Sequence, residues 1–177
     1  MLPGMSPVVQ AMPLLAAVLF VSLSLLAPAA WPEGKASKWN GYQRLDFALP
    51  NDGARCIVVR PKQAAAGNPW IWRARFWGHQ PALDLQLLEK GFHLAYCEVS
   101  GLFGASTAVK RWDKFHALAV REGLSPRPVL EGMSRGGLII FNWASANPEN
   151  STTPGFVRLC NWVRECLRRK YASGKAD

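Results

Sequence analysis

The sequence has 177 residues, of which 49% are hydrophobic and 19% are charged. This composition is typical of a globular domain and excludes the disordered and collagen-like classes. A formal net charge of +9 raises the question of nucleic-acid binding, but residues 151–177 hold six basic residues against two acidic ones, and the rest of the excess is spread without runs. We therefore expect one domain and no nucleic-acid partner.

The N-terminal segment is typical of an exported protein. Residues 1–32 contain no charged side chain, and the apolar run at 14–26 has the length of a secretory h-region. The small residues of Ala27-Pro28-Ala29 follow it, so we predict a signal peptide over 1–29. An uncleaved membrane anchor is the alternative, because no Lys or Arg precedes the apolar run. Either way the rest of the chain is expected to be periplasmic or extracellular, and only an anchor would touch a membrane.

The next residues predict a hairpin followed by alternating strands and helices. Strands at 44–49 and 54–60 are joined by the turn sequence Pro50-Asn51-Asp52-Gly53, after a polar leader. The alternating part predicts a parallel sheet with helices on its faces, and therefore an α/β class. Its predicted elements are a strand at 69–76, a helix at 81–90, a strand at 92–99, a helix at 106–122, a short buried strand at 128–131, a helix at 135–146 and a final amphipathic helix at 156–171.

Four cysteines form an even set, which permits disulfides in an exported chain. Cys56 and Cys97 lie in apolar, strand-like runs, where a free thiol behaves as a small hydrophobic group. Cys160 and Cys166 have no histidine nearby, so a zinc site is not expected. We predict no metal and no cofactor, and the disulfide state stays open.

One motif carries chemistry. The segment Gly132-Met133-Ser134-Arg135-Gly136, followed by Gly137, matches G-x-S-x-G between a predicted strand and a predicted helix. The residues two before and two after the serine must lack bulk so that the strand and helix backbones can pass each other. The helix N-terminus then directs its free N–H groups toward a developing oxyanion. The pattern predicts a serine nucleophile.

The segments PWIWRARFWGHQPALDLQLLEKGFHLAYCEV and RPVLEGMSRGGLIIFNWASANPE resemble exported bacterial serine hydrolases of the α/β-hydrolase superfamily. The resemblance covers about residues 40–149. It implies an α/β-hydrolase-like three-layer sandwich with a mostly parallel sheet, of which this chain would hold the N-terminal half. It also implies hydrolysis of a small-molecule or carbohydrate ester, or of a peptide, through an acyl-enzyme.

The same resemblance assigns roles to particular residues. Ser134 would be the nucleophile, and the backbone N–H of Arg135 would be one oxyanion donor. The second donor would lie in the turn at 75–77, where we choose Phe76. Gly132, Gly136 and Gly137 would be the glycines of the nucleophile turn.

The chain departs from the superfamily after the nucleophile. There the acid and the histidine follow the serine, whereas here all three histidines precede Ser134 and only Glu149, Glu165 and Asp177 follow it. We therefore expect an incomplete triad and an impaired enzyme, because a serine without a general base is a poor nucleophile. Residues 150–177 would be a divergent basic helix, at the end of a truncated, out-of-frame or naturally short chain.

Other candidate residues have more ordinary interpretations. His79 is a conceivable substitute base but is more simply a loop residue, while His93 and His116 are expected to be structural. Glu131 is expected to pair with a nearby arginine.

The aromatic residues of the strand at 69–76 have two possible roles. Trp70 and Trp72 share one strand face, which favours core packing over a sugar-binding platform, and Arg73 and Arg75 alternate on the other face as salt-bridged residues or anion contacts. Two function classes follow: an impaired serine hydrolase, or a chain without catalysis, which is either a remnant or a module that retains the fold and binds a carbohydrate or a membrane surface.

Overall fold

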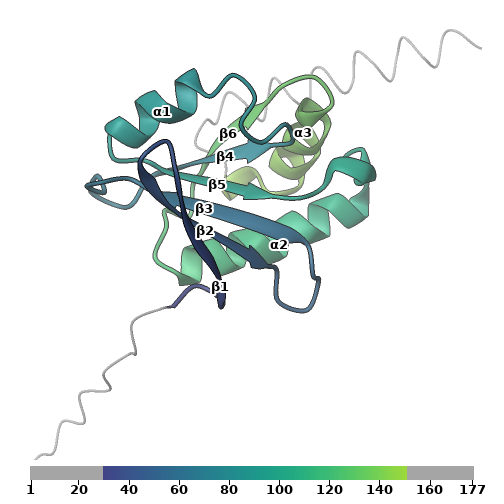
Figure 1. Cartoon of the computed structure of the whole chain (residues 1–177). Helices are drawn as coiled ribbons and strands as arrows, with labels where there is room; N and C mark the ends of the chain where they lie inside the picture. The colour runs from purple at the N-terminus through teal and green to yellow at the C-terminus, as the bar shows by residue number, and fades with distance from the viewer. Residues whose placement is uncertain (1–29, 151–177) are drawn as a thin grey trace, which may run out of the picture.

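The computed structural model describes residues 30–150 (Figure 1), so the predictions of a signal peptide at 1–29 and of a helix at 156–171 lie outside the described residues. In this part of the chain, six strands form one sheet in the order β1-β2-β3-β5-β4-β6. The strands are β1 (Gly34–Trp39), β2 (Tyr42–Ala48), β3 (Arg55–Arg60), β4 (Trp70–Ala74), β5 (His93–Cys97) and β6 (Val129–Gly132). The helices are α1 (Ala82–Glu89), α2 (Ser106–Arg121) and α3 (Gly136–Ala146), with single 3₁₀ turns η1 (Ser100–Leu102) and η2 (Pro148–Asn150).

The first three strands form an antiparallel meander. The predicted hairpin of β2 and β3 is confirmed, but the leader before it is itself a strand, β1, which pairs antiparallel with β2. Asn40 and Gly41 connect β1 to β2 with φ values of 47° and 83°. Two consecutive residues with positive φ are what a tight hairpin turn requires, because their twist matches that of the flanking strands. The Asn-Gly pair therefore makes β1 possible.

The expectation of a mostly parallel α/β-hydrolase sandwich is wrong for the described chain. The sheet is mixed: β4 pairs parallel with β5 and β6, whereas the three other pairings, β1–β2, β2–β3 and β3–β5, are antiparallel. For the first two antiparallel pairings, β1–β2 and β2–β3, the physical reason is connection length. The turns at 40–41 and 49–54 are too short to return a chain to the same end of the sheet, so their strands must run in opposite directions.

The two faces of the sheet bury separate apolar clusters. Helix α1 covers one face and places Leu88 against Ile57, Ile71 and Leu94. Helices α2 and α3 cover the other face (Figure 1), where Trp72 of β4 stacks on Trp112 of α2 with ring centroids 3.9 Å apart. The helices thus hold β4 in the interior of the protein.

The aromatic residues of β4 are core residues. Trp70 and Trp72 are both 0% exposed, and Trp72 also meets the ring of Trp143 from α3 edge-on. Side chains without exposed surface offer no stacking platform to a sugar. The core-packing interpretation is confirmed, and this pair does not support carbohydrate binding.

Strand β6 is less buried than the sequence predicts. Within residues 30–150 it pairs only with β4, and Val129 at its start is 36% exposed. It lies at the edge of the described sheet, so one side of its backbone has no neighbouring strand there. Among the same residues, no helix is both long enough and apolar enough to cross a membrane.

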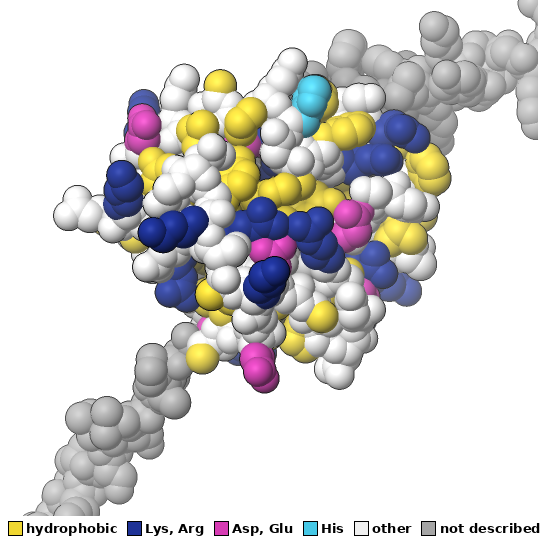
Figure 2. Space-filling view, in the orientation of Figure 1, with side chains coloured by type: hydrophobic (Ala, Val, Ile, Leu, Met, Phe, Trp, Pro, Cys, Tyr) yellow, Lys and Arg dark blue, Asp and Glu magenta, His cyan; other side chains and the backbone are white. Residues whose placement is uncertain are grey.

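Charged side chains on the surface are mixed in sign. In Figure 2, Lys and Arg side chains form a band across the visible face with Asp and Glu side chains among them. On β2, Asp46 pairs with Arg44 at 2.6 Å and with Arg55 of β3 at 3.1 Å. These arginine contacts hold the pKa of Asp46 below its usual value although partial burial acts to raise it.

Candidate active site

Ser134 occupies the turn between β6 and α3, as the motif predicts. The strand ends at Gly132 and the helix begins at Gly136, with Arg135 at its N-cap position. Ser134 itself has a φ of 51° and is exposed. Residues other than glycine rarely adopt this left-handed conformation, and where they do the strain often belongs to a functional turn. Hydrogen bonds from Gly136 N to Met133 O and from Gly137 N to Ser134 O, at 2.8 and 2.9 Å, fix the turn.

The two glycines of the G-x-S-x-G pattern lie at close backbone approaches. A Cβ atom on Gly136 would stand 2.4 Å from the carbonyl oxygen of Ala74 at the end of β4. A Cβ atom on Gly132 would stand 2.2 Å from the end of the Ile140 side chain and 2.9 Å from the carbonyl oxygen of Gly136. Gly137 differs, since a Cβ there would meet only Phe141 at 3.8 Å. The absence of side chains at 132 and 136 therefore lets α3 start directly against β4.

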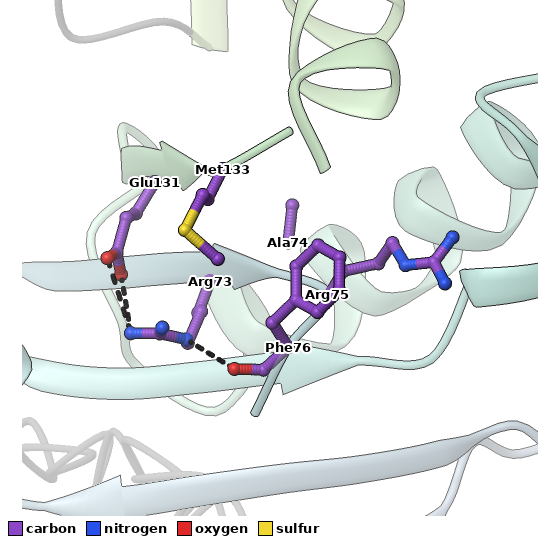
Figure 3. A pocket seen from close by; sticks show the side chains of 6 residues that line it. All are labelled: Arg73, Ala74, Arg75, Phe76, Glu131 and Met133. Atoms are coloured by element: carbon purple, nitrogen blue, oxygen red, sulfur yellow. Dashed lines mark hydrogen bonds and ion pairs between the residues drawn. The ribbon is translucent and has the colours of Figure 1, made fainter. Parts of the chain in front are cut away.

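The loop that follows β4 is the other wall of the site. Arg75 and Phe76 have φ values of 63° and 45°, so this loop turns sharply where the strand ends. It faces Glu131 and Met133, the residues just before Ser134, across a small pocket of about 10 Å³ (Figure 3). The other lining residues are Arg73, Ala74, Arg75 and Phe76. A cavity of this size has room for about one water molecule.

The two predicted oxyanion donors have free N–H groups in the described structure. Neither the backbone N–H of Phe76 nor that of Arg135 meets an acceptor within residues 30–150. Arg135 also stands at the N-terminus of α3, where the helix dipole favours negative charge. Both groups are therefore available to donate to an external oxygen atom.

A buried guanidinium joins the two walls of the site. Arg73 of β4 is only 4% exposed. Its Nε donates to the carbonyl oxygen of Phe76 at 3.2 Å, and its Nη2 donates to the carbonyl oxygen of His79. Its Nη1 pairs with Asp84 in the first turn of α1. The same atom also pairs with Glu131 of β6 at 3.2 Å, as Figure 3 shows. One side chain thus contacts β6, the loop at 76–79 and α1.

A buried carboxylate, Asp84, and a half-buried one, Glu131, share this single guanidinium. Burial raises the pKa of Glu131 to about 7, and the hydrogen bond and negative charge of Asp84 act in the same direction against the attraction of Arg73. Burial also raises the pKa of Asp84, which is 0% exposed, although Glu131 and Arg73 oppose that rise. Since one positive charge cannot compensate two negative ones, we infer that the pair retains one proton up to near neutral pH.

The three histidines do not reach Ser134. His79 is exposed and contributes its carbonyl oxygen to Arg73. His93 begins β5, and burial lowers its pKa. His116 of α2 stacks against Trp70 and shares a hydrogen bond of 2.8 Å with the carbonyl oxygen of Pro126. Throughout residues 30–150, no hydrogen bond joins the Ser134 hydroxyl to a histidine or carboxylate.

Other predicted residues are found as follows. Glu131 pairs with an arginine as expected, and Arg75 donates to the carbonyl oxygen of Ser100 at 2.8 Å while lying over the Phe76 ring. Sequence reasoning missed Asp84 as the partner of Arg73, because an acidic residue in the first turn of a helix is ordinarily explained by the helix dipole. An arginine inside a strand of buried tryptophans is itself a signal that a carboxylate partner exists elsewhere.

Comparison with known proteins finds a likeness in structure but none in sequence. Neither a known family nor a curated protein matches the sequence. The structure of a cold-adapted esterase from an Arctic intertidal metagenomic library, in a PEG-bound complex, is similar with a TM-score of 0.52 and 13% sequence identity. The match covers 66% of this chain and 61% of the esterase chain. At this identity the likeness is one of fold.

The close approach at Gly136 predicts a position-specific effect. Gly136→Ala should lower the free energy of unfolding by about 2 kcal/mol, because the new methyl group collides with the Ala74 carbonyl. Gly137→Ala, the same chemical change one residue later, should instead raise stability by up to about 1 kcal/mol through helix propensity. Urea denaturation of both variants measures the difference, and equal effects would contradict the packing described.

The raised pKa of Glu131 predicts how stability depends on pH. Between the ordinary pKa of 4.5 and the raised pKa of about 7, Glu131 holds a proton in the folded state that it has already released in the unfolded chain. The free energy of unfolding should therefore fall as pH rises through this window and level off above it. In Glu131→Gln that fall should be shallower, because the amide keeps the shape but does not titrate.

Denaturation midpoints across the window test this expectation. The half-buried His93, whose pKa is lowered, contributes a slope of opposite sign to wild type and variant alike, so this contribution cancels in the difference between their curves. That difference reports the Glu131–Asp84 pair. Glu149→Gln is the matched control, since this carboxylate is exposed. Parallel curves for wild type and Glu131→Gln would show that the Glu131 pKa is unshifted.

Proposed function

We propose that this chain is a serine hydrolase acting on esters through an acyl-enzyme, with Ser134 as the nucleophile. The observation that carries the proposal is the backbone of Ser134, held at a φ of 51° between a strand and a helix that approach each other at Gly132 and Gly136. This is the arrangement of the nucleophile turn in the α/β-hydrolase superfamily. The esterase with a similar fold gives coarser support for the same chemistry.

The proposed reaction assigns a role to each wall of the pocket. The Ser134 hydroxyl attacks the ester carbonyl carbon, and the carbonyl oxygen becomes an oxyanion. The free N–H groups of Arg135 and Phe76 donate to that oxyanion, and the N-terminus of α3 adds favourable potential. The hydroxyl proton passes to solvent water as the new C–O bond forms. The oxyanion then collapses and expels the leaving oxygen as an alkoxide or phenolate, which takes up a proton from water. Water hydrolyses the acyl-Ser134 ester, which releases the carboxylic acid and regenerates the hydroxyl.

The surroundings of Ser134 favour esters over peptides as substrates. No imidazole contacts Ser134 within residues 30–150, so no histidine of the described chain is placed to protonate a leaving amine. An alkoxide or phenolate leaves without that help far more readily than an amine. We therefore propose a small-molecule ester as the substrate class, with turnover by this chain well below that of a complete triad enzyme.

Export belongs to the proposal as well. It rests on the uncharged N-terminal segment with its apolar run and small-residue site. An exported ester hydrolase would meet its substrate outside the cytoplasm.

The test is acylation by para-nitrophenyl acetate, with and without added imidazole as an external base. We expect peptide mass mapping to find the acetyl group on Ser134 and imidazole to raise the acylation rate severalfold. Without imidazole the rate should be about 10³ to 10⁴ over water, the residual catalysis that oxyanion donors and binding supply. Ser134→Ala should abolish the acylation and its response to imidazole.

Ser37→Ala, an exposed serine on β1, is the matched control and should behave as wild type. Acetyl groups spread over lysines, with equal nitrophenol release from Ser134→Ala, would contradict the proposal. That outcome would favour the alternative of a non-catalytic chain that keeps the turn as scaffold.

A further inference from the structure

Two cysteines face each other across the centre of the sheet. Cys56 of β3 and Cys97 of β5 are direct partners in the antiparallel register. Both are 0% exposed, and both are free thiols in this structure. They belong to the same apolar cluster, beneath α2, so their side chains project from the same face of the sheet.

The hydrogen-bond register places the Cα atoms of Cys56 and Cys97 at a separation that suits a disulfide. The neighbouring residues Arg55 and Glu98 form a hydrogen-bonded pair, with Glu98 N donating to Arg55 O at 2.9 Å. Hydrogen-bonded and non-hydrogen-bonded pairs alternate along an antiparallel ladder, so Cys56 and Cys97 are a non-hydrogen-bonded pair, with Cα atoms about 4.5 Å apart. A disulfide needs Cα atoms about 4.4–6.8 Å apart.

The two thiol groups also interact. The neighbouring Cys56 side chain and burial together raise the pKa of the Cys97 thiol well above its usual value, while the Cys56 thiol donates to the carbonyl oxygen of Ala54 at 3.6 Å. Because the two residues are register partners in one cluster, their sulfur atoms lie on the same side of the sheet. Bringing them to bonding distance requires rotation about side-chain bonds rather than movement of the strands.

We propose that Cys56 and Cys97 form a disulfide when the chain folds in an oxidising compartment. Each sulfur loses its hydrogen and the two sulfurs bond. The two electrons and two protons pass to a disulfide oxidant, either a thiol–disulfide oxidoreductase or a small-molecule disulfide such as oxidised glutathione, which becomes two thiols. The proposal depends on export for its setting and is independent of the hydrolase chemistry of Ser134.

Position in the sheet gives this bond a defined effect. β3 and β5 are the strands at which the antiparallel meander meets the parallel strands, so the bond ties the two parts of the sheet together. The loop that it closes, from 56 to 97, contains β4, the turn at 75–77 and α1. The bond would limit the freedom of this whole segment in the unfolded chain.

The burial of both sulfurs determines when the bond forms. An oxidant cannot reach side chains with no exposed surface, so oxidation must occur during folding, before α2 covers them. For the same reason a reductant should open the bond slowly in the folded protein and rapidly after unfolding.

The test is refolding of the full-length chain in a glutathione redox buffer, then alkylation and trypsin digestion without reduction. Cleavage after Arg55, Lys62, Lys90 and Lys110 should release a linked pair of peptides, 56–62 and 91–110, lighter than the two free peptides by two hydrogen atoms. The Cys160→Ser, Cys166→Ser double variant should give the same link, since the other two cysteines are not needed. Oxidised protein should have a Tm about 10 °C above reduced protein.

Cys97→Ala is the thermal control and should show no difference between oxidising and reducing buffer. If that variant does not fold, the peptide map of the wild type still decides. Full alkylation of Cys56 and Cys97 after oxidative refolding, or links to Cys160 or Cys166 in the unsubstituted chain, would overturn the proposal. None of these readouts requires hydrolysis, so failure of the hydrolase proposal leaves the test intact.

Discussion

A single buried guanidinium organises the part of this protein where chemistry is proposed. Arg73 contacts β6 through Glu131, the turn after β4 through two carbonyl oxygens, and α1 through Asp84. Its burial requires partners, because an unpaired charge in an apolar core costs far more than a typical protein can spare. The positions of the serine turn and of the Phe76 turn are therefore not independent: each is set relative to the same side chain.

The two parts of the sheet contribute in different ways. The antiparallel meander of β1, β2 and β3 contributes no residue to the pocket at the Ser134 turn. The parallel strands β4 and β6 end side by side at Ala74 and Gly132, so the two turns that follow them meet at one edge. A turn after a parallel strand is a frequent place for a site in mixed α and β proteins, because loops from neighbouring strands converge there.

Local signals in the sequence predicted the elements better than their arrangement. The helices, the β2–β3 hairpin and the Ser134 turn follow from residues close together in the chain, and the Asn40-Gly41 pair is a local hairpin signal for β1. The direction of the sheet depends on β5 entering between β3 and β4, which no local pattern encodes. Likewise, Arg73 and Glu131 are 58 residues apart in the sequence. The expected burial of Glu131 predicted that it pairs with an arginine, but which arginine and in what geometry depends on the fold.

That span has a kinetic consequence. The turns of the β1–β2–β3 meander close over a few residues, and such hairpins form in about 1–10 μs. The pairing of β4 with β6 must close a far longer loop, and the chain entropy of that loop is lost before the stabilising contacts between the two strands form. From loop length alone we expect the meander to form first and the serine turn late. Contacts made late mainly govern how fast a native protein opens rather than how fast it forms. The part of this molecule with the proposed chemistry is then also the part that sets its kinetic lifetime.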